Sequence, residues 1–373
     1  MGVMADLSEP STSMHVAAPA TLRAGFADTA RGICIVMVVM MHSALGVGVA
    51  MNGTGFVHDI IAFAKPFRMP DFFMVSGLFI AGSLTLPWRQ FLDRKVIHFA
   101  YFYGLWLLII LLIKSGELRL LSPGAFLEAY ATGLVEPFST LWFIHLLPFF
   151  FLFARLTRGL APFAVLFIAV ALHLLAASCP GDDPYAMGST LTPSTMVNSF
   201  CLYLIYFLIG HHFRARIFSF ARLVAARPKA ATFGLVCWAL EQAIGVRTGL
   251  ADIPGFTLIY AIFGALAVVT LASLLERWRW FDWLAICGRH SLTIYLSFVL
   301  PMAAGRLVLV KSELFDSVGL VSALVTAGAI MASLALGAAV RGGWLGFLFR
   351  RPAWAHLAAN SAGATSPPAR LPV

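Results

Sequence analysis

The 373-residue chain is 60% hydrophobic and only 12% charged, which is more apolar surface than a soluble domain can bury. Because helices satisfy their own backbone inside lipid, long apolar runs at this composition predict an all-α, polytopic integral membrane protein. The formal net charge of +9 does not indicate a nucleic-acid partner, since Lys and Arg of membrane proteins concentrate in cytoplasmic loops.

The apolar runs predict about ten transmembrane helices. They lie near residues 31–51, 58–84, 97–113, 139–154, 160–178, 197–213, 230–246, 255–275, 290–310 and 317–340. The second run is too long for one span and contains Pro66 and Pro70. Because proline is tolerated in the first turn of a helix, we predict a short interfacial segment at 58–65 and the true span at 69–84.

The basic residues predict the orientation of these spans. With the N-terminus in the cytoplasm, most Lys and Arg fall on the inner side, and the outer loops hold only Lys114, Arg119, Arg247 and Lys311. This asymmetry predicts an N-in/C-in, multi-pass protein.

One membrane domain, residues 26–345, is predicted between two cytoplasmic tails. The tails, residues 1–25 and 346–373, have the composition of disordered segments. The N-terminus lacks the basic start and apolar core of a signal peptide. The five cysteines are scattered without a C-x-x-C spacing, so they support neither a disulfide framework nor a metal site.

Two ionisable residues share one face of the first predicted span. Arg31 and His42 are eleven positions apart, which is about three helical turns with roughly 20° left over, and a rise of about 16 Å. Ionisable groups at membrane depth are costly and mark functional paths by default. The alternative is that Arg31 only anchors the helix at the membrane surface and that His42 only bonds a neighbouring helix.

Further polar residues fall at similar predicted depths. Histidine is the usual general base near neutral pH, and arginine stabilises anions and oxyanions. Each residue also has a structural alternative: Arg68 and Asp71 are spaced to pair on one helix, Asp28 can cap the first helix or pair with Arg31, and Arg306 can extend outward to the membrane surface. The residues of this set are Asp28, Arg68, Asp71, His145, Tyr203, Tyr206 and Arg306.

Several strings, in this order, resemble the membrane-bound acyltransferase 3 family, whose members acylate surface carbohydrates and related molecules. The similarity covers roughly residues 26–340. It begins with Asp28-x-x-Arg31-Gly32 and the Arg-x10-His spacing to His42. It continues in residues 67–77 (Phe-Arg-Met-Pro-Asp-Phe-Phe-Met-Val-Ser-Gly), 91–95, 141–143, 203–210 and 288–296 (Gly-Arg-His-Ser-Leu-Thr-Ile-Tyr-Leu).

The resemblance implies an O-acyltransferase of the inner membrane with acyl-CoA as co-substrate and no bound cofactor or metal. His42 would be the general base, with Arg31 and Asp28 completing the catalytic set. Arg31, Arg94 and Lys95 would bind the donor phosphates. The acceptor-side or oxyanion candidates would be Arg68, Asp71, His145, Arg306 and Tyr295. The acceptor would be a cell-surface or exported carbohydrate, and a second copy or polysaccharide-synthesis proteins are compatible partners.

The chain also departs from the family pattern and leaves alternatives open. Many members carry a histidine where Phe298 stands and an arginine where His98 stands. Acetyl is the default acyl group and succinyl an alternative. A transporter or flippase of a polar or anionic solute is the second function, because charged residues at mid-depth and proline-broken helices also suit alternating access. A catalytically inert partner protein is the third.

Overall fold

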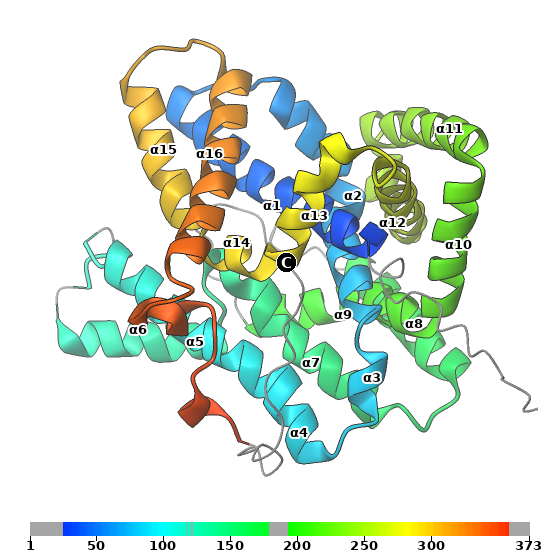
Figure 1. Ribbon diagram of the computed structural model, residues 1–373, viewed down its shortest axis with the longest axis horizontal. Helices are drawn as coiled ribbons and strands as arrows, with labels where there is room; N and C mark the ends of the chain where they lie inside the picture. Colours follow the sequence, from blue (N-terminus) through cyan, green and yellow to red (C-terminus); the bar gives the residue numbers. More distant parts are fainter. Residues whose placement is uncertain (1–24, 117, 121, 179–192, 358–373) are drawn as a thin grey trace, which may run out of the picture.

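The computed structural model describes residues 25–357 except 117, 121 and 179–192, and these residues fold into helices (Figure 1). The first half contains α1 (Gly25–Met51), α2 (Phe56–Gly77), α3 (Ala81–Leu84), α4 (Trp88–Leu92), the π-helix η2 (Asp93–Ile97), α5 (His98–Lys114), α6 (Pro123–Val135), the 3-10 turn η3 (Ser139–Leu141), α7 (Trp142–Leu156) and α8 (Pro162–Ser178).

The second half contains α9 (Pro193–His212), α10 (Arg214–Ala226), α11 (Pro228–Arg247), η4 (Leu250–Asp252), α12 (Phe256–Leu275), η5 (Arg279–Phe281), α13 (Asp282–Arg289), α14 (Ser291–Ser297), α15 (Val299–Lys311), α16 (Val318–Ala339), and the 3-10 turns η6 (Trp344–Leu348) and η7 (Ala353–Ala355). Helix α1 lies at the centre, packed against α2, α12, α13, α15 and α16.

Glycines let two pairs of helices pack backbone to backbone. A Cβ at Gly32 of α1 would lie 1.9 Å from the carbonyl oxygen of Leu284 in α13, and a Cβ at Gly288 would lie 1.8 Å from that of Asp28. The α2–α9 crossing is built the same way by Gly77 and Gly210. Small residues at such crossings allow the close contact that drives helix association in lipid.

Helix α2 runs unbroken through Pro66 and Pro70, so the predicted division into a segment at 58–65 and a span at 69–84 is wrong. Proline removes an amide and leaves the carbonyl four residues earlier without its helical donor, here those of Ala62 and Pro66. Side chains bond other carbonyls of this part of α2: Gln242 of α11 donates to the Phe63 carbonyl at 3.1 Å, and Arg68 Nη1 lies 3.5 Å from the Ile61 carbonyl.

Two helix pairs are sharply bent. The axes of α14 and α15 differ by 56° and those of α9 and α10 by 73°. Pro301 explains the first bend, because its missing N–H leaves the carbonyl of Ser297 without the usual helical partner. Phe298 lies at this bend and is fully buried.

Each of the ten predicted apolar runs is helical in the structure, although 58–84 is divided between α2 and α3 and 290–310 between α14 and α15. This confirms an all-α architecture for the described residues. Length and apolar composition alone qualify four helical stretches as membrane spans: α1, Trp88–Lys114, α12 and α16. Each bent pair adds one, which gives up to six within the described part of the chain. The count of ten spans and the N-in/C-in orientation stay predictions.

Part of the predicted C-terminal tail is ordered. Residues 346–357, assigned to a disordered tail from composition, carry the turns η6 and η7 and pack against α5 and η2. Contacts with residues distant in the sequence order this segment, and such contacts cannot be predicted from its amino-acid composition. Residues 1–24 and 358–373, the rest of the predicted tails, lie outside the described residues.

We predict that Gly32→Ala destabilises the fold, since the added methyl would meet the backbone of α13. Overpacking of this kind costs about 1–3 kcal/mol or more. Thermal unfolding of the detergent-purified protein measures the loss. The matched control is Gly328→Ala in α16, where a Cβ would meet no atom within 4 Å. An equal loss in both variants would contradict this account of the crossing.

Candidate active site

Arg31 lies near the start of α1, where its guanidinium is only partly buried. Nη1 donates to Asp28 Oδ1 at 3.2 Å, and the two side chains are 30% and 19% exposed. The guanidinium carbon also lies 4.0 Å from the centroid of the Phe79 ring. The pairing with Asp28, one of the structural alternatives, is therefore present, and it leaves part of the guanidinium accessible.

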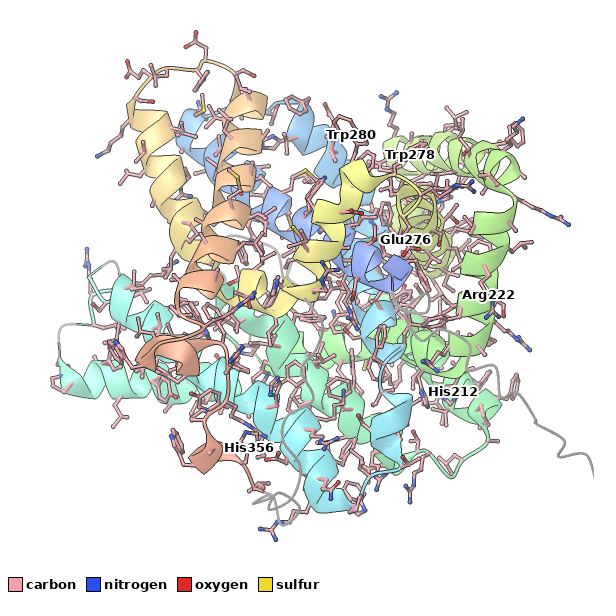
Figure 2. The ribbon with its side chains drawn as sticks, viewed as in Figure 1. His212, Arg222, Glu276, Trp278, Trp280 and His356 are labelled. Carbon is pink, nitrogen blue, oxygen red and sulfur yellow. The ribbon has the colours of Figure 1, made fainter. Side chains whose placement is uncertain are left out.

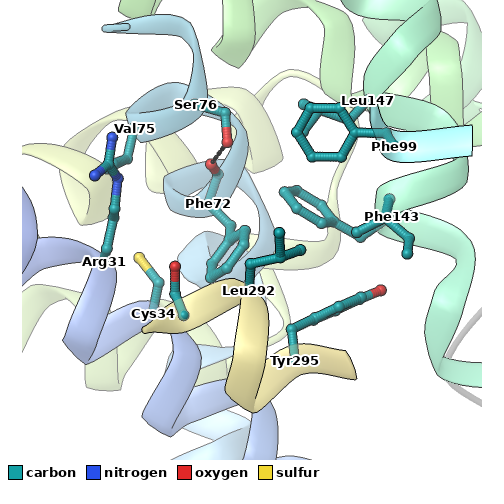
Figure 3. A pocket seen from close by; sticks show the side chains of 12 residues that line it. Arg31, Cys34, Phe72, Val75, Ser76, Phe99, Phe143, Leu147, Leu292 and Tyr295 are labelled. Carbon is teal, nitrogen blue, oxygen red and sulfur yellow. Dashed lines mark hydrogen bonds between the residues drawn. The ribbon is translucent and has the colours of Figure 1, made fainter. Parts of the chain in front are cut away.

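A cavity of about 160 Å³ opens beside Arg31. Four aromatic side chains from α2, α5, α7 and α14 form much of its wall, and Arg31 and Cys34 of α1 face it from one side (Figure 3). The lining residues are Arg31, Cys34, Phe72, Val75, Ser76, Phe99, Phe143, Ile144, Leu147, Ser291, Leu292 and Tyr295. The cavity is thus apolar apart from one cation and a few small polar groups.

Cations gather at the edge of this cavity. Lys95 of η2 is close enough to Arg31 for their charges to interact, and its Nζ lies 4.9 Å from the Phe151 ring centroid. Arg94 is exposed beside it. On another side, Arg341 Nη2 lies 3.0 and 3.3 Å from the ring nitrogens of His290, next to Ser291 on the cavity wall. This concentration of positive charge suits an anionic ligand.

The start of α1 also carries carboxylates. Glu276 lies beside it (Figure 2), so close that a Cβ on Gly25 would overlap the Glu276 carboxyl group. Burial, and secondly the charge of Asp28, raise the pKa of Glu276 above its ordinary value.

His42 lies further along α1 and does not line the cavity. Its ring packs against Phe298, with centroids 5.6 Å apart. Phe298 in turn neighbours Tyr295, with centroids 6.5 Å apart. The ring of His42 makes no hydrogen bond to any residue in the described part of the chain. A row of two aromatic rings therefore separates the cavity from an imidazole whose nitrogens are available.

Two of the predicted acceptor-side arginines flank His42. Arg68 of α2 is buried, and its charge acts on the His42 ring. Arg306 of α15 lies over Gly46, one turn beyond His42: a Cβ at Gly46 would be 2.7 Å from its Nη1. The structure thus groups Arg68, Arg306 and His42, which come from three different helices.

Asp71, His145 and Tyr295 lie elsewhere. Among the ion pairs of the described residues none joins Asp71 to Arg68, so the pair offered as a structural alternative is not formed. Arg68 instead reaches back toward the Ile61 carbonyl, 3.5 Å from its Nη1. Asp71 is fully buried, and neither of its carboxylate oxygens accepts a hydrogen bond from a described residue.

His145 and Tyr295 are held by backbone carbonyls. His145 Nε2 lies 3.1 Å from the Leu134 carbonyl oxygen, and its ring contacts Tyr103, away from His42. The Tyr295 hydroxyl donates to the Thr140 carbonyl while the ring lines the cavity. These contacts give both residues a structural role in positioning α7 against its neighbours.

The sequence pointed to some of the cavity residues only indirectly. Cys34 follows Arg31 by one helical turn and therefore lies on the same face of α1. The contact of Arg341 with His290 joins residues 51 positions apart, which no local pattern signals.

The fold and site define a helical membrane protein with a cation-edged cavity beside its central helix. A family model described as an acyltransferase domain matches residues 25–341, and the chain belongs to the acyltransferase 3 family. It is therefore a membrane acyltransferase by family.

One curated relative supports the same family. The chain is 26% identical over 222 residues to the inner membrane protein YcfT of Escherichia coli strain K12, an alignment that covers 53% of this chain and 58% of that protein. The chain thus spans just over half the length of this relative. No solved structure matches the chain.

We predict that Asp71→Asn raises the melting temperature. An unpaired buried carboxylate costs several kcal/mol, whereas a neutral amide that lacks partners costs about 1–3 kcal/mol. The matched substitution Asp93→Asn is expected to lower it, because Asp93 is paired with Arg351. Differential scanning fluorimetry of both variants checks the opposite signs; a lower melting temperature for Asp71→Asn would show that the carboxylate has a partner in the folded protein.

We predict that the stability gained by Glu276→Gln depends on pH. The pKa of Glu276 is raised in the folded protein. The folded state therefore becomes less stable as pH rises from the ordinary pKa of a glutamate through the raised value, because the charged carboxylate is disfavoured only in the folded protein. Glutamine removes this loss, so the variant's advantage in melting temperature should be absent near pH 4 and present at pH 7 to 8. Melting curves across this range test the sign, and an advantage independent of pH would refute it.

Proposed function

We propose that the chain is an integral membrane O-acyltransferase that moves a small acyl group from acyl-CoA across the membrane to a hydroxyl of a cell-surface or exported carbohydrate. The observation that carries this proposal is the arrangement on α1. One helix holds Arg31 at a cavity with a cationic edge and His42 about 16 Å further along, with an imidazole that makes no hydrogen bond to a described residue.

The donor would bind at the cationic edge. Arg31, Arg94 and Lys95 supply positive charge for the phosphates of acyl-CoA, and the contact of Arg341 with His290 adds to it. The apolar interior of the cavity would take the first part of the pantetheine arm. Acetyl is the default acyl group and succinyl the larger alternative.

The acceptor hydroxyl would approach His42 from the other side. His42 takes the hydroxyl proton while the oxygen attacks the thioester carbonyl; the ester bond forms, the C–S bond breaks, and the proton passes to the departing thiolate. Arg68 and Arg306 lie on the flanks of His42, where a cation stabilises the oxyanion. Because Phe298 and Tyr295 stand between the cavity and His42, the arm must pass these rings, or they must move.

The inner membrane is the location that we propose. The relative is named an inner membrane protein, which supports the inner membrane as the site of action. A donor on the cytoplasmic side and an acceptor outside would then meet across α1.

Transport of a polar or anionic solute is the second candidate function. The bent pairs α9–α10 and α14–α15 favour it, because discontinuous helices line the substrate sites of transporters. Dependence of a product on acyl-CoA separates the two functions.

We predict that His42→Ala abolishes acyl transfer without loss of the protein. Surface glycans from deletion cells complemented with wild type, His42→Ala or His212→Ala are compared by mass spectrometry. His212 is a partly buried histidine at the end of α9, away from α1 (Figure 2). An ester-linked acyl mass is expected with wild type and His212→Ala only. Wild-type acylation by His42→Ala would refute the general-base role; identical glycans in all strains, deletion included, would favour transport.

A further inference from the structure

The ordered C-terminal residues 344–357, here called the strap, lie across α5 and η2. The Tyr101 hydroxyl donates to the Phe347 carbonyl at 3.1 Å, and Trp106 Nε1 donates to the Leu348 carbonyl at 3.0 Å. The Phe349 ring packs on Trp106 with centroids 5.6 Å apart. Figure 2 shows His356 near the end of this segment, far along the chain from the helices it contacts.

The strap converges on one carboxylate, that of Asp93. Arg351 Nη2 donates to Oδ2 at 2.5 Å, and the Leu357 amide donates to Oδ1 at 2.7 Å. His356 Nδ1 lies 3.2 Å from Oδ2. The Arg351 and Asp93 side chains are 3% and 7% exposed, so this ion pair is buried, and removal of one partner would leave an uncompensated charge.

Asp93 is also the residue at which the π-helix η2 begins. The His98 amide donates to the Asp93 carbonyl, which is the i to i+5 bond of a π turn. Arg351 Nη1 donates to the same carbonyl at 2.7 Å. A single arginine of the strap therefore holds both the main chain and the side chain at the start of the π turn.

The π turn sets the direction of the donor-side cations. Arg94 and Lys95 follow Asp93 inside η2, and Phe99, one turn after Lys95, lines the cavity. An α-helix turns by about 100° per residue, so relaxation of the extra residue in the turn would rotate Lys95 away from Phe151 and Arg31 by roughly that angle. Isolated π turns are energetically poor and recur at functional sites.

We propose that the strap is a clamp that keeps the π turn formed, and that Asp93 and Arg351 are positioning residues which aim Lys95 at the edge of the cavity. This role rests on the proposed acyl-CoA site, because it acts through the cations that would bind the donor phosphates. The strap itself need not touch the donor.

The test compares Arg351→Met with Arg350→Met. Arg350 is the adjacent arginine of the strap and is exposed, so both variants lose one charge from the same segment. Hydrogen exchange followed by mass spectrometry reports on residues 91–100 without any substrate. Steady-state transfer from acetyl-CoA gives kcat and KM separately.

For Arg351→Met we expect faster exchange at residues 93–98 and a KM for acetyl-CoA raised on the order of tenfold, the effect of one lost charge-assisted contact, with kcat nearly unchanged. Arg350→Met should match wild type in both. Lys95→Met should raise KM without changing exchange, since it removes the cation and leaves the clamp. Arg351→Lys should restore part of the protection, and it stands in if Arg351→Met fails to accumulate.

Unchanged exchange in Arg351→Met would overturn the clamp. Faster exchange with unchanged KM would overturn its role in donor binding. If the wild type neither binds nor depends on acetyl-CoA or succinyl-CoA, the proposed function fails and the positioning role fails with it, while the exchange data still decide whether the strap holds the π turn.

Discussion

Direct backbone contact at two glycine crossings is the constraint on which the rest of the fold depends. Gly32 with Gly288 brings α1 against α13, and Gly77 with Gly210 brings α2 against α9. Because these contacts have no side chain between the helices, their spacing cannot relax by a rotamer change. They fix α14, which continues from α13, and the end of α2 relative to α1. The cavity between these elements and its Arg31 wall are a consequence.

The central helix α1 sets the distance between two groups of cations along its length. Near its start, Arg31 lines the cavity, and Lys95 lies close enough for the two charges to interact. Further along, Arg68 and Arg306 flank His42 from α2 and α15. Cations at membrane depth cost free energy, and bound anionic groups would offset that cost at both clusters. In the proposed function, these groups are the acyl-CoA phosphates at one cluster and a developing oxyanion at the other.

The sequence predicted the fold class and the positions of the apolar helices well, because apolar run length is a local property. It missed what depends on tertiary contacts. Proline in α2 suggested a break, but the helix continues through both prolines, and a side chain 179 positions away, Gln242, bonds its main chain at Phe63. Arg68 and Asp71 are spaced to pair, but Arg68 reaches toward the Ile61 carbonyl instead. The order of residues 346–357 depends on Asp93, more than 250 positions away.

The two buried aspartates show how differently one fold treats the same charge. Asp93, at the start of η2, is surrounded by Arg351, a backbone amide and His356, so its charge is compensated and can order a distant segment. Asp71, in the middle of α2, has no hydrogen-bond partner among the described residues. A buried carboxylate of the first kind specifies structure; one of the second kind only costs stability unless a ligand, a proton or water compensates it. Asp71 precedes Phe72 in the chain, and Phe72 lines the cavity whereas Asp71 does not.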